Sequence, residues 1–174
     1  MKLFRLFAVG ALALAFAATL AAQDKPAVVT MASSKFITLP VAPACLKLSP
    51  QKGDPTKEAA LILMKATAGC RIPWHWHTAG ENLMFVSGKA KLEMKDAAPA
   101  TVGAGDFATL PGKHQHQFTC LAACTFFNSI DGPFDIHYVD KDGNEIKPED
   151  ALKSAAPGSK TGKKTGTKKS DQKQ

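Results

Sequence analysis

Residues 69–88 read GCRIPWHWHTAGENLMFVSG and carry most of the information on fold and site. Two histidines, His75 and His77, stand two positions apart. Side chains at this spacing on a strand point to the same face, so the two imidazoles are expected to project together. Residues 78–80 then give the chain room to bend and bring the carboxylate of Glu81 back to them. The stretch therefore predicts a strand that carries a cluster of metal-ligand side chains.

A second histidine pair follows a Pro111-Gly112 turn, at His114 and His116. One more imidazole from this pair completes a set of three neutral imidazoles and one carboxylate. Such a mixed nitrogen and oxygen set suits Mn, Fe, Ni, Cu or Zn. At this point either His116 or His114 could supply this imidazole.

The glycines around the first histidine pair extend the pattern. Gly69 lies six positions before His75, and Gly88 lies seven positions after Glu81. Together with His77, these positions resemble the first sequence motif of the cupin family without departure. Five residues at four fixed spacings would rarely coincide by chance, so this resemblance is specific.

The second motif is matched less closely. Gly105, Pro111 and His116 resemble it in spacing, but the glycine after the proline stands at position 112 rather than 113, and Cys120 replaces the usual Asn. Sixteen residues separate the two motifs, a short linker typical of single-domain cupins. The resemblance covers roughly residues 65–130.

The resemblance implies an all-β fold, a jelly-roll barrel of two antiparallel sheets with one divalent transition metal inside. The implied ligands are His75, His77, Glu81 and His116. Gly69, Gly88 and Gly105 would lie at turns where φ is positive. Gly88, between two strand-like runs, would form a hairpin.

The rest of the chain supports short strands separated by Gly, Pro and Asp, as in a sandwich or barrel. A short helix is expected at 148–153, because Pro148 suits a first helical turn and Glu149 and Asp150 suit its positive end. The strand-like runs are 28–31, 36–39, 60–64, 83–86, 89–94, 107–110, 114–119, 125–128 and 134–139.

Both ends of the chain differ from its middle. Residues 1–22 have two positive charges, an apolar run and then Ala21-Ala22, which predicts a secretory signal peptide and a periplasmic or secreted protein. The apolar run is shorter than the ~20 residues that span a bilayer, so no membrane span is expected. Residues 154–174 lack large apolar side chains and predict a disordered, Lys-rich tail. The expected domain is residues 23–153.

The charge distribution argues against nucleic-acid binding. The net charge is +7, but the signal segment carries two of these charges and the tail a net five. The remaining domain is close to neutral, whereas a nucleic-acid-binding domain needs a basic face of its own.

Four cysteines in an exported protein predict disulfides, for which three pairings exist. Cys120 and Cys124 bracket a short turn between two expected strands, which favours a bridge between them. By elimination, Cys45 would pair with Cys70.

Function is narrowed to two classes. A divalent ion bound by three neutral imidazoles and one carboxylate keeps a charge of about +1 and has coordination positions left open. These properties favour a metal-dependent enzyme that acts on a small carboxylate or oxygen-rich substrate. Its reaction would be of the dioxygenase, decarboxylase or isomerase type. The alternative is a non-catalytic binding module of the cell envelope, for a sugar or another small molecule, or a sensor.

A protein threaded unfolded across the membrane acquires its ion outside, which favours Zn, Cu or Mn over Fe or Ni. A homodimer is the default assembly for the family that the motifs resemble.

Overall fold

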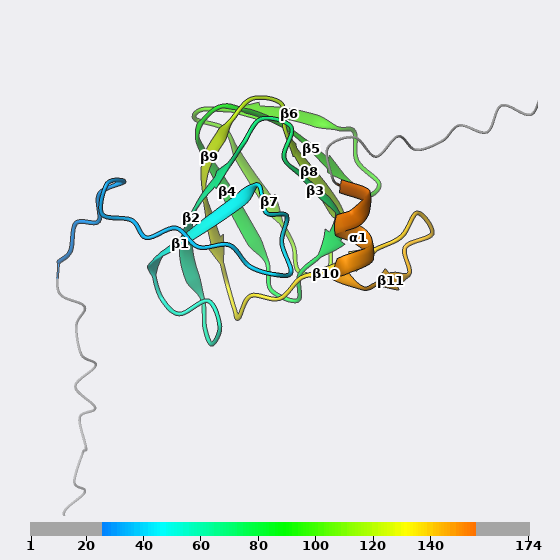
Figure 1. The fold of residues 1–174 in the computed structure, drawn as a ribbon, viewed down its shortest axis with the longest axis horizontal. Helices are drawn as coiled ribbons and strands as arrows, with labels where there is room; N and C mark the ends of the chain where they lie inside the picture. Colours follow the sequence, from blue (N-terminus) through cyan, green and yellow to red (C-terminus); the bar gives the residue numbers. More distant parts are fainter. Residues whose placement is uncertain (1–25, 156–174) are drawn as a thin grey trace, which may run out of the picture.

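The strands form two antiparallel sheets that face each other, in a computed structural model that describes residues 26–155 (Figure 1). The first sheet has five strands in the order β1 (Leu46–Lys52), β2 (Ala60–Ala66), β9 (Cys124–Ile130), β4 (Glu81–Ser87) and β7 (Phe107–Leu110). The second has six strands in the order β11 (Glu145–Ile146), β10 (His137–Val139), β3 (Arg71–Trp76), β8 (His116–Cys120), β5 (Lys89–Met94) and β6 (Ala100–Gly103). The predicted all-β jelly roll of two antiparallel sheets is confirmed.

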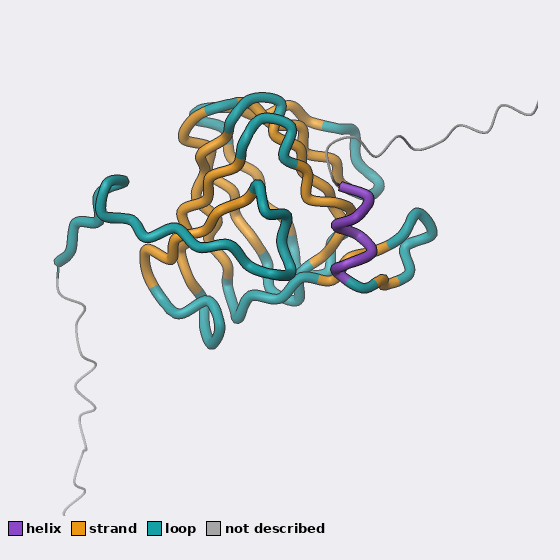
Figure 2. Tube along the Cα trace, viewed as in Figure 1, coloured by secondary structure: helices purple, strands orange, loops and turns teal. Residues whose placement is uncertain are grey.

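The core lies between the two sheets because their strands alternate in burial. In β9 every second residue is buried from Cys124 to Ile130, as a strand with one face on a core requires. Phe85, Phe118 and Phe126 come from both sheets and meet there, with ring centroids 5.1 to 6.1 Å apart. Figure 2 shows the strands of the two sheets, in orange, with loops, in teal, below them and across the front.

The predicted hairpin at Gly88 is wrong. The strand before it, β4, belongs to the five-stranded sheet, and the strand after it, β5, belongs to the six-stranded sheet. Gly88 has φ +88°, and an added Cβ would lie 2.1 Å from the carbonyl oxygen of Ala123. Glycine is therefore required where the chain crosses between sheets against another backbone. The positive φ expected at Gly69 and Gly105 is confirmed.

The N-terminal strand predictions are also corrected. Residues 28–31 form no strand, and Val28 is 91% exposed, because no neighbouring strand is there to pair with them. Of residues 36–39, Ile37 alone pairs, in an isolated bridge to Leu48. The neighbouring strand β1 was not predicted because its sequence, LKLSPQK, has few apolar residues.

The predicted C-terminal helix is confirmed as α1 (Pro148–Ala155), which packs against β3 and β10. It ends two residues beyond the expected domain boundary at 153. No helix within residues 26–155 is long and apolar enough to cross a membrane. The predicted signal peptide, residues 1–22, and residues 156–174 of the predicted tail lie outside the described residues.

Two disulfides, Cys45–Cys70 and Cys120–Cys124, match the favoured pairing. The second joins β8 to β9 where the chain crosses from one sheet to the other. Such bridges are compatible with an oxidising extracellular compartment.

Candidate metal centre

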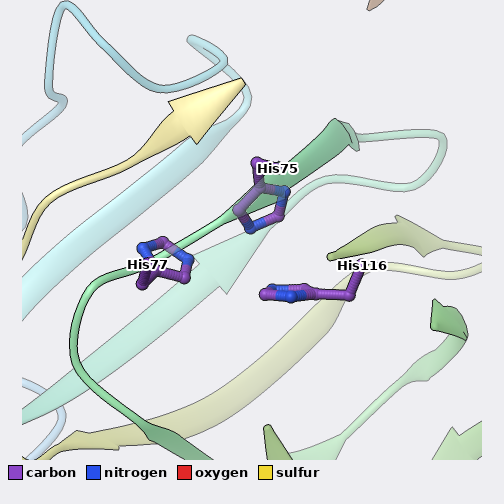
Figure 3. A group of neighbouring side chains, drawn as sticks. All are labelled: His75, His77 and His116. Atoms are coloured by element: carbon purple, nitrogen blue, oxygen red, sulfur yellow. The ribbon is translucent and has the colours of Figure 1, made fainter. Parts of the chain in front are cut away.

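Three of the predicted ligands converge inside the barrel. His75 is on β3, His77 follows the end of that strand, and His116 begins β8, directly opposite His75 in the pairing of the two strands. One ring nitrogen from each lies within 4.8 Å of the others, and all three residues are buried. Figure 3 shows the three imidazoles turned toward one another.

The other nitrogen of each ring is fixed by a backbone carbonyl. The Nδ1 atoms of His75, His77 and His116 contact the oxygens of Pro73 (2.6 Å), Asp135 and His114 (2.8 Å), respectively. A carbonyl oxygen only accepts, so each Nδ1 must donate. In a neutral ring this leaves Nε2 as an unprotonated lone pair, which is the state of a metal ligand held by an outer hydrogen bond.

Glu81, at the start of β4, brings its carboxylate to the same point. Its Oε2 lies 3.2 Å from His77 Nε2 and 3.5 Å from His116 Nε2. Its Oε1 accepts a hydrogen bond from the side-chain amide of Asn128 on β9. With neutral rings, the carboxylate faces lone pairs and there is no proton between them. The donor set therefore fits a cation.

The burial of these side chains sets their charge states. Burial lowers the pKa of His75 well below 6.5. Burial also lowers the pKa of His77. The Glu81 carboxylate and the Asp135 carbonyl raise this pKa, but by less. Burial alone would raise the pKa of Glu81, but positive charge at His77 and His116 and hydrogen bonds with His116 and Asn128 lower it. With neutral rings, a bound cation would supply that positive charge. Neutral imidazoles beside an ionised carboxylate are the protonation states that metal binding requires.

A cavity of about 40 Å³ adjoins the four side chains. Apart from the four, its wall is apolar except for Asn128, and it includes Met64, Phe118, Phe126 and Phe134. The volume is enough for one or a few water-sized groups. A ligand inside it must therefore be small.

The remaining residues singled out in the sequence lie elsewhere. His114 is half-buried and lies outside the cluster. Its backbone carbonyl oxygen contacts His116 Nδ1 and so links it to the site. His137 stacks on Trp76, with ring centroids 3.9 Å apart, and its ring nitrogens lie 3.3 Å from the carboxylates of Asp135 and Glu145.

Asn128 was not foreseen. It lies in the strand sequence CTFFNSI, where one amide among strand residues carries no signal of its own.

Comparison with known proteins finds one matching domain family and several similar solved structures. Residues 62–128 match the family model described as a cupin domain. An RmlC-like cupin from Ralstonia eutropha is 18% identical, with a TM-score of 0.56 over 75% of this chain and 85% of its own. The polyketide cyclase RemF from Streptomyces resistomycificus is 16% identical, with a TM-score of 0.58 over 67% of this chain and 87% of its own. A DMSP lyase, DddQ from Ruegeria pomeroyi, is 17% identical, with a TM-score of 0.51 over 67% of this chain and 61% of its own.

Residues 62–128 of this chain are therefore assigned to a cupin domain, and the solved structures share its fold. No curated protein matches the chain. At these identities the solved structures show the fold, and their different activities leave the reaction open.

Proposed function

We propose that this protein is an exported, metal-dependent cupin that acts on a small carboxylate or oxygen-rich substrate. One divalent transition metal would be held by His75, His77, Glu81 and His116. The observation that carries this proposal is the cluster of one ring nitrogen from each of His75, His77 and His116, with each Nδ1 already donating to a backbone carbonyl. The Glu81 carboxylate lies beside two of these rings, 3.2 Å from His77 Nε2 and 3.5 Å from His116 Nε2.

The surrounding residues would fix the ligands before the ion arrives. The carbonyls of Pro73, Asp135 and His114 set the tautomer and the ring orientation, and Asn128 orients the Glu81 carboxylate. Three of the ligands lie on strands of a rigid barrel and His77 directly follows one, so they lose little freedom on binding. When bound, a divalent ion supplies a Lewis acid that polarises a carbonyl or lowers the pKa of a bound water.

Charge and cavity size support the substrate class. Three neutral imidazoles and one carboxylate leave a divalent site with a charge of about +1, which attracts an anionic oxygen. The apolar wall keeps this attraction in a low-dielectric setting, where it is stronger than in water. The cavity of about 40 Å³ limits the bound part to a few heavy atoms.

One observation favours a second candidate, a non-catalytic module that binds a small molecule in the cell envelope. The cavity wall offers no acid or base beyond the four proposed ligands. An isomerase, which must move a proton on its substrate, is the class least supported by such a wall. A dioxygenase-like oxidoreductase or a decarboxylase remains compatible with it.

The metal and the location belong to the same proposal. The two disulfides support a periplasmic or secreted protein. An ion acquired there would be Zn, Cu or Mn, with Fe or Ni less favoured. Outside the cytoplasm, the identity of the bound ion depends on which ions are available and on their affinity for the site. Metal analysis of protein purified from the periplasm tests this, and stoichiometric iron would contradict it.

The experiment that separates the two functions loads the protein with each of these metals in turn. Small carboxylates and enolates are then added while oxygen uptake, carbon dioxide release and heat of binding are measured. Turnover that is lost in Glu81→Ala and His116→Ala would support the enzyme. Saturable binding without turnover would support the module.

A further inference from the structure

Residues 38–45, here called the strap, lie between the metal cavity and a larger hollow on the surface. This surface groove has a volume of about 790 Å³ and is formed by the strap, the turn at 67–70 and Leu152 of α1. Ala42 lines both the groove and the metal cavity. In Figure 1 this blue-to-cyan segment crosses in front of the sheets before it enters β1.

The strap is held firmly at its ends. On one side, Ile37 exchanges two backbone hydrogen bonds with Leu48, at 2.8 and 2.9 Å. On the other side, Cys45 is bonded to Cys70, and its carbonyl accepts a hydrogen bond from the amide of Thr67. Between these points the backbone forms turns and pairs with no strand.

The middle of the strap is tied to the barrel by a side chain. The hydroxyl of Tyr138 on β10 donates to the carbonyl oxygen of Val41 over 2.9 Å. Tyr138 is 1% exposed and pairs with His75 on the neighbouring strand, with ring centroids 6.0 Å apart. One side chain thus connects the strap to a proposed metal ligand.

The strap also borders a third hollow, of about 120 Å³. Leu39 lines this hollow as well as the groove. Leu48 and Phe134 line this hollow as well as the metal cavity. Each of the three spaces therefore has at least one strap residue in its wall.

We propose that the strap gates the metal cavity: small ligands pass from the groove beside Ala42, and the Tyr138 hydroxyl is the latch that keeps the strap closed. The inference rests on the proposed function, because the ligand passes to the proposed metal site. The four proposed ligands are at most 6% exposed and the cavity beside them measures about 40 Å³, so exchange of a ligand is easier when part of the wall moves. A segment that is fixed at its two ends, with turns and no strand pairing between them, is the part of the wall that we expect to open at least cost.

The test follows azide binding to cobalt-loaded protein by visible absorption in a stopped-flow instrument. Tyr138→Phe removes the latch and keeps the ring against His75. We expect azide to bind about fivefold faster, the factor that corresponds to one ordinary hydrogen bond of about 1 kcal/mol. Ala42→Val should slow binding by narrowing the passage. Its matched control is Ala44→Val, because Ala44 lines the groove and not the metal cavity, and this variant should bind azide at the wild-type rate.

The outcomes are separable. A wild-type azide rate in Tyr138→Phe would overturn the latch, and equal rates or faster binding in Ala42→Val relative to Ala44→Val would overturn the route. The alanine pair tests the route even if Tyr138→Phe does not fold. Failure of the wild-type protein to bind cobalt would instead contradict the proposed function. Hydrogen exchange on metal-free protein then still tests the latch, since Tyr138→Phe should exchange faster over residues 38–45, and unchanged exchange there would overturn it.

Discussion

Asn128 donates its side-chain amide to Glu81 Oε1, and this contact leaves the amide oxygen of Asn128 buried without a hydrogen-bond partner among the described residues. Leaving a buried acceptor unsatisfied is costly, typically about 1–3 kcal/mol. The arrangement holds the carboxylate in place but lowers the stability of the fold. Such a cost is expected of a residue that serves a binding site, and not of an amide whose role is only structural.

Asn128→Ala should therefore weaken metal binding while keeping the fold. Loss of a group that orients a ligand typically lowers metal affinity about 10–100-fold. Titration with zinc against a competing chelator measures the change. Gln117→Ala is the control, because Gln117 is also buried and polar but contacts Arg71 and Glu93 rather than the four proposed ligands. Equal affinities for the two variants would contradict a role for Asn128 at the site.

The buried histidines predict how the stability of the metal-free protein depends on pH. Burial lowers the pKa of His75 and His77 below 6.5, so at lower pH the unfolded chain binds protons that the folded chain does not. The free energy of unfolding should then fall as the pH drops below 6.5, by up to about 1.4 kcal/mol per pH unit for each histidine. Urea unfolding between pH 7.5 and 5 measures this slope. His75→Gln should flatten it, and an unchanged slope would show that His75 is not buried in its neutral form.

Two glycines with the same φ predict unequal effects of substitution. Gly88 and Gly105 both have φ +88°, but an added Cβ at Gly88 would lie 2.1 Å from Ala123 O, whereas nothing lies within 4 Å at Gly105. Gly105→Ala should cost about 1–3 kcal/mol from backbone strain alone. Gly88→Ala should cost clearly more, because the crossing between the sheets must also move. Unfolding in urea compares them, and equal losses would rule out the close approach at Gly88.

Much of the fold and site could be predicted because the decisive signals are local. His75, His77 and Glu81 lie within seven residues of one another: His75 is on β3, His77 directly follows that strand, and Glu81 begins β4. The strand alternation from 89 to 94 reflects a real buried face, and Pro148 with its acidic neighbours marks a real helix start.

The features that were missed depend on contacts far apart in the sequence. A glycine between two strands has the same local sequence signal whether the strands pair with each other or belong to different sheets. The sequence alone therefore predicts a hairpin at Gly88. Residues 28–31 have strand propensity, but a strand also needs a partner, and none lies beside them. Asn128 reaches Glu81 across 47 positions of the chain, a relationship that no single-sequence pattern contains.

The metal content of His116→Ala and His114→Ala, measured side by side after reconstitution with zinc, tests the central claim most directly. His116 supplies a ring nitrogen to the cluster, whereas His114 supplies a backbone carbonyl that alanine retains. We expect His116→Ala to lose stoichiometric metal and His114→Ala to keep it. Metal retained in His116→Ala, or lost in His114→Ala alone, would contradict the proposed ligand set.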